Sequence, residues 1–466
     1  MLESSIGSGA FLVPVVERLL ESARRHGVPL GSLSGSIHGV DLQPEHVETC
    51  RAKLDQLLLA AGATHEEATA LSGEWLHQGD FLLDEMPGGV DFVVGNPPYI
   101  RTEDLDDEVE AEYRARWRTM RGRADIYVGF YEQSLGLLKP GGKLGYICAD
   151  RWMRNAYGKY LRGLVVSGYA VETVWQMHDV NAFEAEVSAY PAITVLANTR
   201  QGPATLIDTT ALFGAESAHE ATAFVLGSDE EAAGQGWEGA RLPTWFETAD
   251  FWPAGSPGTI KLLERLQEEF PTLEADGKTK ISIGVATGAD KADIVGQGVD
   301  VEPERLTPIV MADDIRAGHL KTPTKVLLNP WDAEGRLVDL DAFPKFAALL
   351  GSHEDVKKRS VAKKNPLTWH RTIDRVYPGL AERPKLLLQD MKAQITPVLE
   401  PGGYYPHHNL YYVVSDSWDL EVLGGLLLSR IAEAFRSRDR DAATRAAEEA
   451  YGLAPGETAR ERKRAA

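Results

Sequence analysis

The stretch Val90-Asp91-Phe92-Val93-Val94-Gly95-Asn96-Pro97-Pro98-Tyr99 joins an apolar strand to a rigid polar turn. Two prolines fix the backbone and remove two donors, and the residue before the first proline is pushed toward an extended conformation. Asn96 and the carbonyl of Pro97 thereby become a fixed pair of acceptors that can hold both hydrogens of an amine. Tyr99 can stack on a flat group held there. Taken alone, these residues also fit a plain turn that ends a strand, so the surrounding pattern decides.

That pattern predicts an α/β fold with a mostly parallel sheet. Short apolar runs alternate with helix-period segments through the first two hundred residues, which is typical of a parallel sheet covered by helices on both faces. We expect strands at 36–41, 75–80, 90–94, 143–149, 171–177 and 192–197, and helices at about 10–26, 44–61, 127–138 and 157–166. In such sheets ligands bind at the carboxyl ends of the strands, which is where Asn96 falls.

Chain length and composition indicate how many domains the protein has. The 466 residues, 43% hydrophobic and 25% charged, suffice for two or three domains. A Gly-, Ala- and Glu-rich stretch at 201–245 is interpreted as an acidic linker or insertion, 246–440 as a second, mixed α+β domain, and 441–466 as a charged tail.

No signal segment or apolar run of about 18 residues is present, which argues against secretion and membrane spanning. Cys50 and Cys148 are too few for a disulfide framework or a zinc site; we expect no metal and a cytoplasmic location.

The charge distribution points to two basic surfaces on an acidic chain. A formal net charge of −20 argues against indiscriminate coating of polyanions. Between residues 351 and 392, however, ten basic residues stand against five acidic ones. Such clusters are often merely solvated surfaces. Beside a catalytic pocket, however, their basic side chains would contact the phosphates of a nucleic acid. The candidate contacts are Arg114, Arg116, Arg118, Arg121 and Arg123 after the Pro-Pro turn, and Lys357, Lys358, Lys363 and Lys364 in the second domain.

Two glycines and two carboxylates at three other strand ends suggest a nucleoside site. Gly7 and Gly9 open a helix, where backbone amides can approach a ligand closely. Asp41 closes the next strand and could accept hydrogen bonds from a ribose diol, while Asp80 closes the third and could hold an adenine amine. Each carboxylate alone is more often a helix cap or a turn residue. Three such strand ends followed by Asn-Pro-Pro-Tyr are hard to explain as caps.

These motifs together resemble the gamma-type DNA adenine amino-methyltransferases of restriction-modification systems. The similarity runs through residues 3–12, 79–83 and 91–99, and continues through 126–131, 138–142 and an aromatic, Phe183, ahead of 187–190. The second domain is more loosely similar to the family's target-recognition region, at 283–288, 383–388 and 409–414. The resemblance implies a Rossmann-like methyltransferase catalytic domain at 1–200 and a DNA target-recognition domain at 246–440.

The resemblance also implies a role for each matching residue. Glu3, Gly7 and Gly9 would border the methionine part of S-adenosylmethionine, Asp41 its ribose, and Asp80, Phe81 and Phe130 its adenine. Asn96 and the Pro97 carbonyl, on the Pro97-Pro98 turn, would orient the amine of an adenine flipped out of double-stranded DNA, between Tyr99 and Phe183. Flipping costs a few kcal/mol of pairing and stacking, which the two aromatics would help to offset. The implied reaction is direct methyl transfer, with no metal and no covalent enzyme intermediate.

One departure concerns the start of the chain. The family's first motif completes a strand, yet only Met1 and Leu2 precede Glu3, and Ser4 stands where the family has proline. We therefore expect the central strand to be nearly missing, the loop at 3–9 to be poorly held, and the isolated chain to bind S-adenosylmethionine weakly, unless a partner subunit supplies the missing element.

Three alternatives stay open. The same Asn-Pro-Pro-Tyr motif also holds the substrate nitrogen in methyltransferases that act on glutamine amides of proteins and in those that act on guanine amines of RNA. Those enzymes usually lack so large a second domain. The third is a non-catalytic DNA-binding subunit of a restriction or phage-defence complex.

Overall fold

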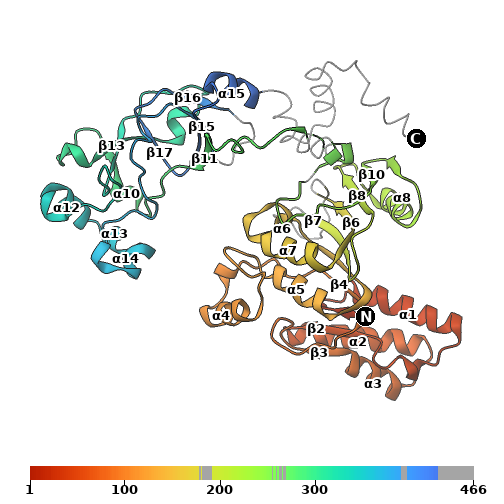
Figure 1. Ribbon diagram of the computed structural model, residues 1–466. Coiled ribbons are helices and arrows are strands. Elements are labelled where there is room, and N and C mark those ends of the chain that lie inside the picture. The colour runs from red at the N-terminus through yellow and green to blue at the C-terminus, as the bar shows by residue number, and fades with distance from the viewer. Residues whose placement is uncertain are drawn as a thin grey trace, which may run out of the picture. The chain divides into compact units, whose positions relative to one another are not determined.

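The computed structural model describes residues 1–177, 180, 191–253, 255–258, 260–261, 265, 269–389 and 396–428. The chain divides into two compact units, Met1–Lys261 and Leu262–Ala466, shown in red to yellow-green and in green to blue in Figure 1. No helix among the described residues is both long enough and apolar enough to cross a membrane.

Unit 1 is built on one ten-stranded sheet with the order β3-β2-β1-β4-β5-β7-β6-β8-β10-β9. The strands from β3 to β5 are parallel, whereas β7 pairs antiparallel with both β5 and β6. This confirms the predicted α/β fold. The strands are β1 (Leu2–Glu3), β2 (His38–Asp41), β3 (Leu76–Gln78), β4 (Val90–Gly95), β5 (Leu138–Ala149), β6 (Ala170–Gln176), β7 (Pro191–Ala197), β8 (Ala204–Thr209), β9 (Glu231–Gly234) and β10 (Trp237–Leu242).

Local sequence signals explain the boundaries of the helices that cover this sheet. Helix α1 (Leu12–His26) ends at Gly27, whose φ of 67° suits a left-handed cap. Proline begins α2 (Pro44–Ala60), and Thr64 with Glu67 forms a capping box on α3 (His65–Trp75), a helix that our sequence analysis missed. The other α-helices that the structure describes in unit 1 are α4 (Asp107–Arg116), α5 (Tyr127–Leu137), α6 (Arg151–Arg154), α7 (Lys159–Gly168) and α8 (Ala215–Leu226).

Three apolar clusters hold unit 1 together, and the smallest packs α8 against β8 and β10 through Phe224, Ile207 and Trp237. One joins α1, α2 and α3 to the sheet through residues such as Ile6, Ile37 and Leu76. The largest packs α5 and α7 against β4, β5 and β6, and it includes Trp245 and Trp252. The core of unit 1 therefore extends past the domain boundary expected from the sequence.

The interpretation of 201–245 as a linker is wrong. Strand β8 pairs parallel with β6, β10 pairs antiparallel with β8, and α8 packs on β9 and β10, so this segment continues the first sheet. Buried Leu206 and Ile207 lie next to each other on β8, so both faces of this strand are covered. The polar composition of the segment comes from α8 and the turns, whose outer faces meet solvent.

Unit 2 contains two four-stranded sheets, with the orders β11-β18-β15-β16 and β12-β14-β13-β17. All their pairs are antiparallel except β13 with β17. The strands are β11 (Thr279–Ile283), β12 (Ile294–Gly296), β13 (Leu306–Val310), β14 (Lys325–Leu328), β15 (Lys385–Gln389), β16 (Val398–Glu400), β17 (Tyr405–Pro406) and β18 (Leu410–Ser415). The helices are α10 (Asp290–Asp293), α11 (Ala312–Ile315), α12 (Pro344–Gly351), α13 (Glu354–Lys358), α14 (Ser360–Lys364) and α15 (Leu420–Leu427).

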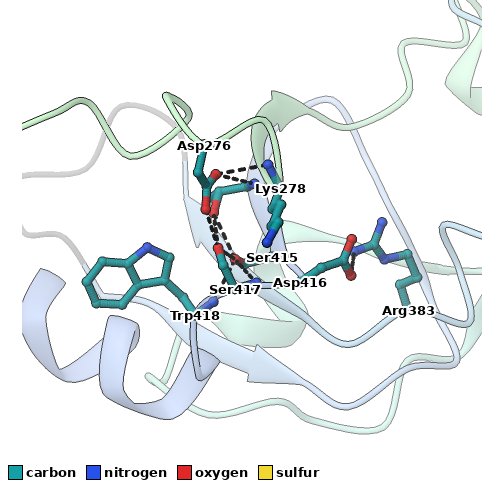
Figure 2. Close-up of polar contacts among 8 residues, drawn as sticks. Asp276, Lys278, Arg383, Ser415, Asp416, Ser417 and Trp418 are labelled. Atoms are coloured by element: carbon teal, nitrogen blue, oxygen red, sulfur yellow. Dashed lines mark hydrogen bonds and ion pairs between the residues drawn. The ribbon is translucent and has the colours of Figure 1, made fainter.

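A polar cluster joins the start of β11 to the end of β18 (Figure 2). Asp276 accepts a hydrogen bond from the Ser417 hydroxyl at 2.5 Å and another from the Lys278 amide at 2.9 Å. The Ser415 hydroxyl accepts from the amide of Trp418, whose side chain is 41% exposed. These contacts fix where the antiparallel pair of β11 and β18 ends.

Candidate active site

The carboxyl ends of four neighbouring strands gather the predicted site residues. Glu3 is in register with Gly39 of β2 and with Val94 of β4, and β3 lies on the other side of β2. Because these strands are parallel, Glu3, Asp41, Asp80 and Asn96 all fall at one edge of the sheet. Strand β1 has two residues, yet it pairs on both sides.

Glu3 is buried and incompletely hydrogen-bonded. Its side chain is 1% exposed, and its Oε2 atom has no hydrogen-bond partner among the described residues. Burial raises the pKa of Glu3 to about 9, and the nearby Asp41 carboxylate adds to the rise. A buried acid with a free oxygen is suited to a cationic ligand, whose charge would favour the carboxylate form.

The loop after β1 is well held, contrary to our expectation. Gly7 and Gly9 have φ angles of 49° and 90°, in the left-handed region that glycine favours. The Gly7 amide donates to Asp41 Oδ2 at 2.8 Å, the Gly9 amide donates to the Ile6 carbonyl at 2.8 Å, and Lys53 donates to the Ser8 carbonyl. A Cβ added at Gly7 would meet no atom within 4 Å, so the backbone there faces open space.

Two carboxylates in the site are oriented by neighbours. Asp41 Oδ1 lies 3.0 Å from His46 Nδ1 and accepts from the Gln43 amide. Asp80 Oδ1 accepts from the Leu82 amide at 2.8 Å, and Asp80 Oδ2 accepts from the Tyr113 hydroxyl at 2.6 Å. Burial raises the pKa of Tyr113, with a further rise from Asp80, so this phenol stays a donor.

Phe81, which follows Asp80 directly, packs against Phe130. Their rings are stacked with centroids 5.1 Å apart, and both side chains are buried. The structure thus brings together two residues that the sequence resemblance assigned to the same adenine pocket.

The Asn-Pro-Pro-Tyr turn is tied to its neighbours. Tyr99 donates its hydroxyl to Asn96 Oδ1 at 2.9 Å, and its ring meets Tyr127 edge-on at 6.3 Å. Ser5 donates to the Asn96 carbonyl at 3.0 Å, which joins the loop after β1 to this turn. An amide oxygen has two lone pairs, so Asn96 Oδ1 can accept from Tyr99 and from one further donor.

Ser4, at the position where the resembled family has proline, joins a buried polar chain. Its hydroxyl lies 2.7 Å from the Tyr146 hydroxyl, which lies 2.6 Å from the Ser134 hydroxyl. The substitution therefore leaves no unpaired hydroxyl, and it adds a link between the first loop and strand β5.

Some side chains of the two basic clusters form contacts within the protein, and most are exposed to solvent. Arg114 donates to Glu110, to Thr102 Oγ1 and to the carbonyls of Met120 and Gly122, so these internal contacts hold its side chain. Among the other candidates, Arg116 donates to the Leu83 carbonyl and Arg123 pairs with Glu103 at 3.1 Å. Exposed side chains belong to Arg116, Arg118, Arg121, Arg123, Lys357, Lys358, Lys363 and Lys364.

Sequence reasoning missed the residues that orient the site, and one of its candidates cannot be placed. Ser5, His46 and Tyr113 were not singled out, since only the folded chain brings each to its partner. Ser5 alone had a signal, because it lies inside a matched motif. Phe183, proposed to stack on an extruded base, lies outside the described residues.

Comparison with known proteins identifies the family. Residues 35–183 match the Eco57I restriction-modification methylase family. The type II methyltransferase M.PaeR7I of Pseudomonas aeruginosa is 42% identical over 440 residues, covering 93% of this chain and 76% of the relative. M.XhoI of Xanthomonas vasicola, also a type II methyltransferase, is 38% identical over 93% of this chain and 81% of its own. This chain belongs to the type II DNA methyltransferases of restriction-modification systems.

A solved structure supports the fold independently. The type IIL restriction-modification enzyme MmeI, solved in complex with DNA, superposes with a TM-score of 0.55 at 11% identity. The match covers 92% of this chain and 58% of MmeI, so this chain spans a little over half of that enzyme.

The cofactor of this family, S-adenosylmethionine, fits the residues at the sheet edge. The unpaired Glu3 oxygen suits its cationic methionine end, and the open backbone at Gly7 leaves room for close approach. Asp41 and Asp80, held by His46 and Tyr113, are the acceptors that would bind its ribose and its adenine amine.

Proposed function

We propose that this chain methylates the exocyclic amine of a specific adenine in double-stranded DNA. The observation that carries the proposal is the position of Asn96 beside Tyr99, at the edge of the sheet that also presents Glu3 and Asp41. The proposal includes a cytoplasmic location and a role in restriction-modification or phage defence, with or without a partner subunit.

The chain's own residues would prepare the amine for attack. Asn96 Oδ1 and the Pro97 carbonyl would accept its two hydrogens, which favours a pyramidal nitrogen with an exposed lone pair. When bound, S-adenosylmethionine supplies the methyl group on a sulfonium. Tyr99 would lie against the base while its hydroxyl keeps Asn96 in position. Preorganised acceptors of this kind act without reorganising during the reaction.

Transfer of a labelled methyl group to DNA, RNA and protein substrates tests this proposal. The expected result is label in double-stranded DNA alone. Label in protein glutamine or in RNA would support an enzyme of the other amino-methyl classes. DNA binding without any transfer would support a non-catalytic specificity subunit.

Removing the Tyr99 hydroxyl should slow transfer without loss of stacking. In Tyr99→Phe the ring remains but Asn96 Oδ1 loses its 2.9 Å hydrogen bond. We expect a rate loss of about 5-fold, as for a typical hydrogen bond of about 1 kcal/mol. Single-turnover rates measure it, with Tyr160→Phe, at an exposed tyrosine of α7, as the control. Equal rates for Tyr99→Phe and the parent would show that the hydroxyl does not position Asn96.

The lysines of α13 and α14 should contribute to the salt dependence of DNA binding. Each phosphate contact accounts for roughly one unit of the slope of log affinity against log salt. We therefore expect a flatter slope when Lys357, Lys358, Lys363 and Lys364 are replaced by Ala. The double variant Lys321→Ala, Lys325→Ala, with two exposed lysines of the same unit, is the control. A slope as steep as the parent's would show that these four lysines do not contact DNA phosphates and only face solvent.

A further inference from the structure

A carboxylate and two imidazoles lie together in unit 2, among residues that the proposed reaction does not use. Asp290 begins α10, and His407 and His408 follow β17 directly. One ligand atom from each of the three residues lies within 4.8 Å of the other two. His407 is 3% exposed, and the other two side chains are half-buried.

The spacing within this cluster is close to that of metal ligands. His407 Nε2 lies 3.0 Å from Asp290 Oδ2. Two ligands of a tetrahedral Zn²⁺ ion, with bonds of about 2.0 to 2.2 Å, stand about 3.3 to 3.6 Å apart. The Nδ1 atom of His407 is buried and has no hydrogen-bond partner among the described residues. Because one imidazole offers a single nitrogen to a given ion, Nε2 is the ligand atom of His407 here, and Nδ1 is not part of the coordination.

The ligand atoms are held by their surroundings. Thr287, fully buried, donates its hydroxyl to Asp290 Oδ1 at 2.6 Å, which leaves Oδ2 directed at His407. The same hydroxyl accepts from the Ala289 amide at 3.1 Å. On the other side, the amides of His407 and His408 donate to the carbonyls of Val310 and Val285. Outer contacts of this kind orient the ligands of metal sites.

The charges around the cluster favour a nitrogen-binding ion over a hard cation. Asp290 and His408 line an open cavity of about 610 Å³, which gives an ion access and leaves room for water. Lys291 and Lys358 line the same cavity and would repel a cation held by charge alone. Imidazole nitrogens bind Zn²⁺, Co²⁺ or Ni²⁺ well, whereas Mg²⁺ and Ca²⁺ prefer oxygen ligands.

We propose that Asp290, His407 and His408 bind one divalent transition-metal ion of the Zn²⁺ class. Water from the cavity completes the coordination. The ion joins the start of α10 to the segment after β17, which lies 117 positions further along the chain. It is therefore a structural cross-link of unit 2, and it takes no part in methyl transfer.

Metal titration of the full chain, prepared without a histidine tag and stripped with a chelator, tests the proposal. We expect equilibrium dialysis to give one Zn²⁺ per chain, and Co²⁺ to give the visible absorption of a site with fewer than six ligands. His407→Gln and Asp290→Asn should each weaken binding at least 10-fold. His319→Gln, which changes an exposed histidine of the same unit, should leave binding unchanged.

A second variant separates binding from folding. Thr287→Val keeps the three ligands but removes the hydroxyl that orients Asp290, and should weaken Zn²⁺ binding roughly 10- to 100-fold. Zn²⁺ should raise the melting temperature of the parent and of His319→Gln, but much less that of Thr287→Val. The proposal is wrong if the parent chain binds no Co²⁺ or Zn²⁺ stoichiometrically. It is also wrong if His407→Gln, folded by circular dichroism, binds Zn²⁺ as tightly as the parent.

Discussion

Replacement of Asn96 by Ala should slow methyl transfer far more than it weakens DNA binding. The Asn96 amide oxygen would accept a hydrogen of the amine as the nitrogen changes geometry, so its contribution grows in the transition state. Loss of one preorganised polar group of this kind costs ~2 to 4 kcal/mol, on the order of 10²-fold in rate.

Single-turnover rates at saturating DNA and cofactor measure this loss. Equilibrium binding of DNA and of S-adenosylmethionine to the same Asn96→Ala protein provides the control, because neither should change more than a few-fold. A transfer rate within a few-fold of the parent would remove Asn96 from the reaction. A parallel loss of both bindings would instead indicate a structural role for Asn96.

Cofactor binding should release a proton through Glu3. In the free protein, burial raises the pKa of Glu3 to about 9, so this group is protonated at neutral pH. A bound cation at its unpaired oxygen would favour the carboxylate, and binding then becomes stronger as the pH rises toward the raised pKa. We expect affinity to rise roughly tenfold per pH unit between about pH 6 and about pH 7.5. In that range an α-amino group, with a pKa near 8, stays largely charged.

Calorimetry in buffers of different ionisation enthalpy counts the proton directly. Glu3→Gln keeps the shape of the side chain but cannot ionise, so its proton release and its pH dependence should largely disappear. An unchanged pH profile in Glu3→Gln would contradict this role. The same titrations test the sequence-based expectation that the isolated chain binds S-adenosylmethionine weakly.

The sign of the pH effect on folding stability follows from the same shift. The Glu3 pKa is higher in the folded chain than its usual value of 4.5, so folding takes up a proton between these two values. The contribution of Glu3 to stability is therefore complete below about pH 4.5 and is lost as the pH rises through about 9. Glu3→Gln should lose less stability than the parent on going from about pH 6 to about pH 9.

The fold of the first unit was predictable where the sequence alternates clearly. Strands such as β4 and helices such as α2 have apolar runs with distinct ends, and their bounds differ by only one residue from those expected. The segment 201–245 was misinterpreted, because Gly, Ala and Glu are typical of linkers. Its buried strands β8 and β10 are recognised only by their pairing with β6 and with each other.

The position of the candidate site was predictable for a geometric reason. The residues that orient its side chains were not predictable. Carboxyl ends of adjacent parallel strands share one edge, so Asp41, Asp80 and Asn96 could be grouped before the structure was known. Glu3 was added to them only by the family resemblance. The contact of Tyr113 with Asp80 spans 33 positions and carries no sequence signal. Similarly, Arg359 and Lys385 counted toward the basic region, yet both are buried in ion pairs with Asp293 and Glu400.

Identification of the methylated base tests the central claim most directly. Double-stranded DNA carrying the target sequence would be incubated with the full chain and S-adenosylmethionine, digested to nucleosides and analysed by mass spectrometry. We predict N6-methyladenine, absent from the product of the Asn96→Ala protein. Methylated cytosine, or unmodified DNA under conditions where cofactor and DNA both bind, would contradict the proposed function.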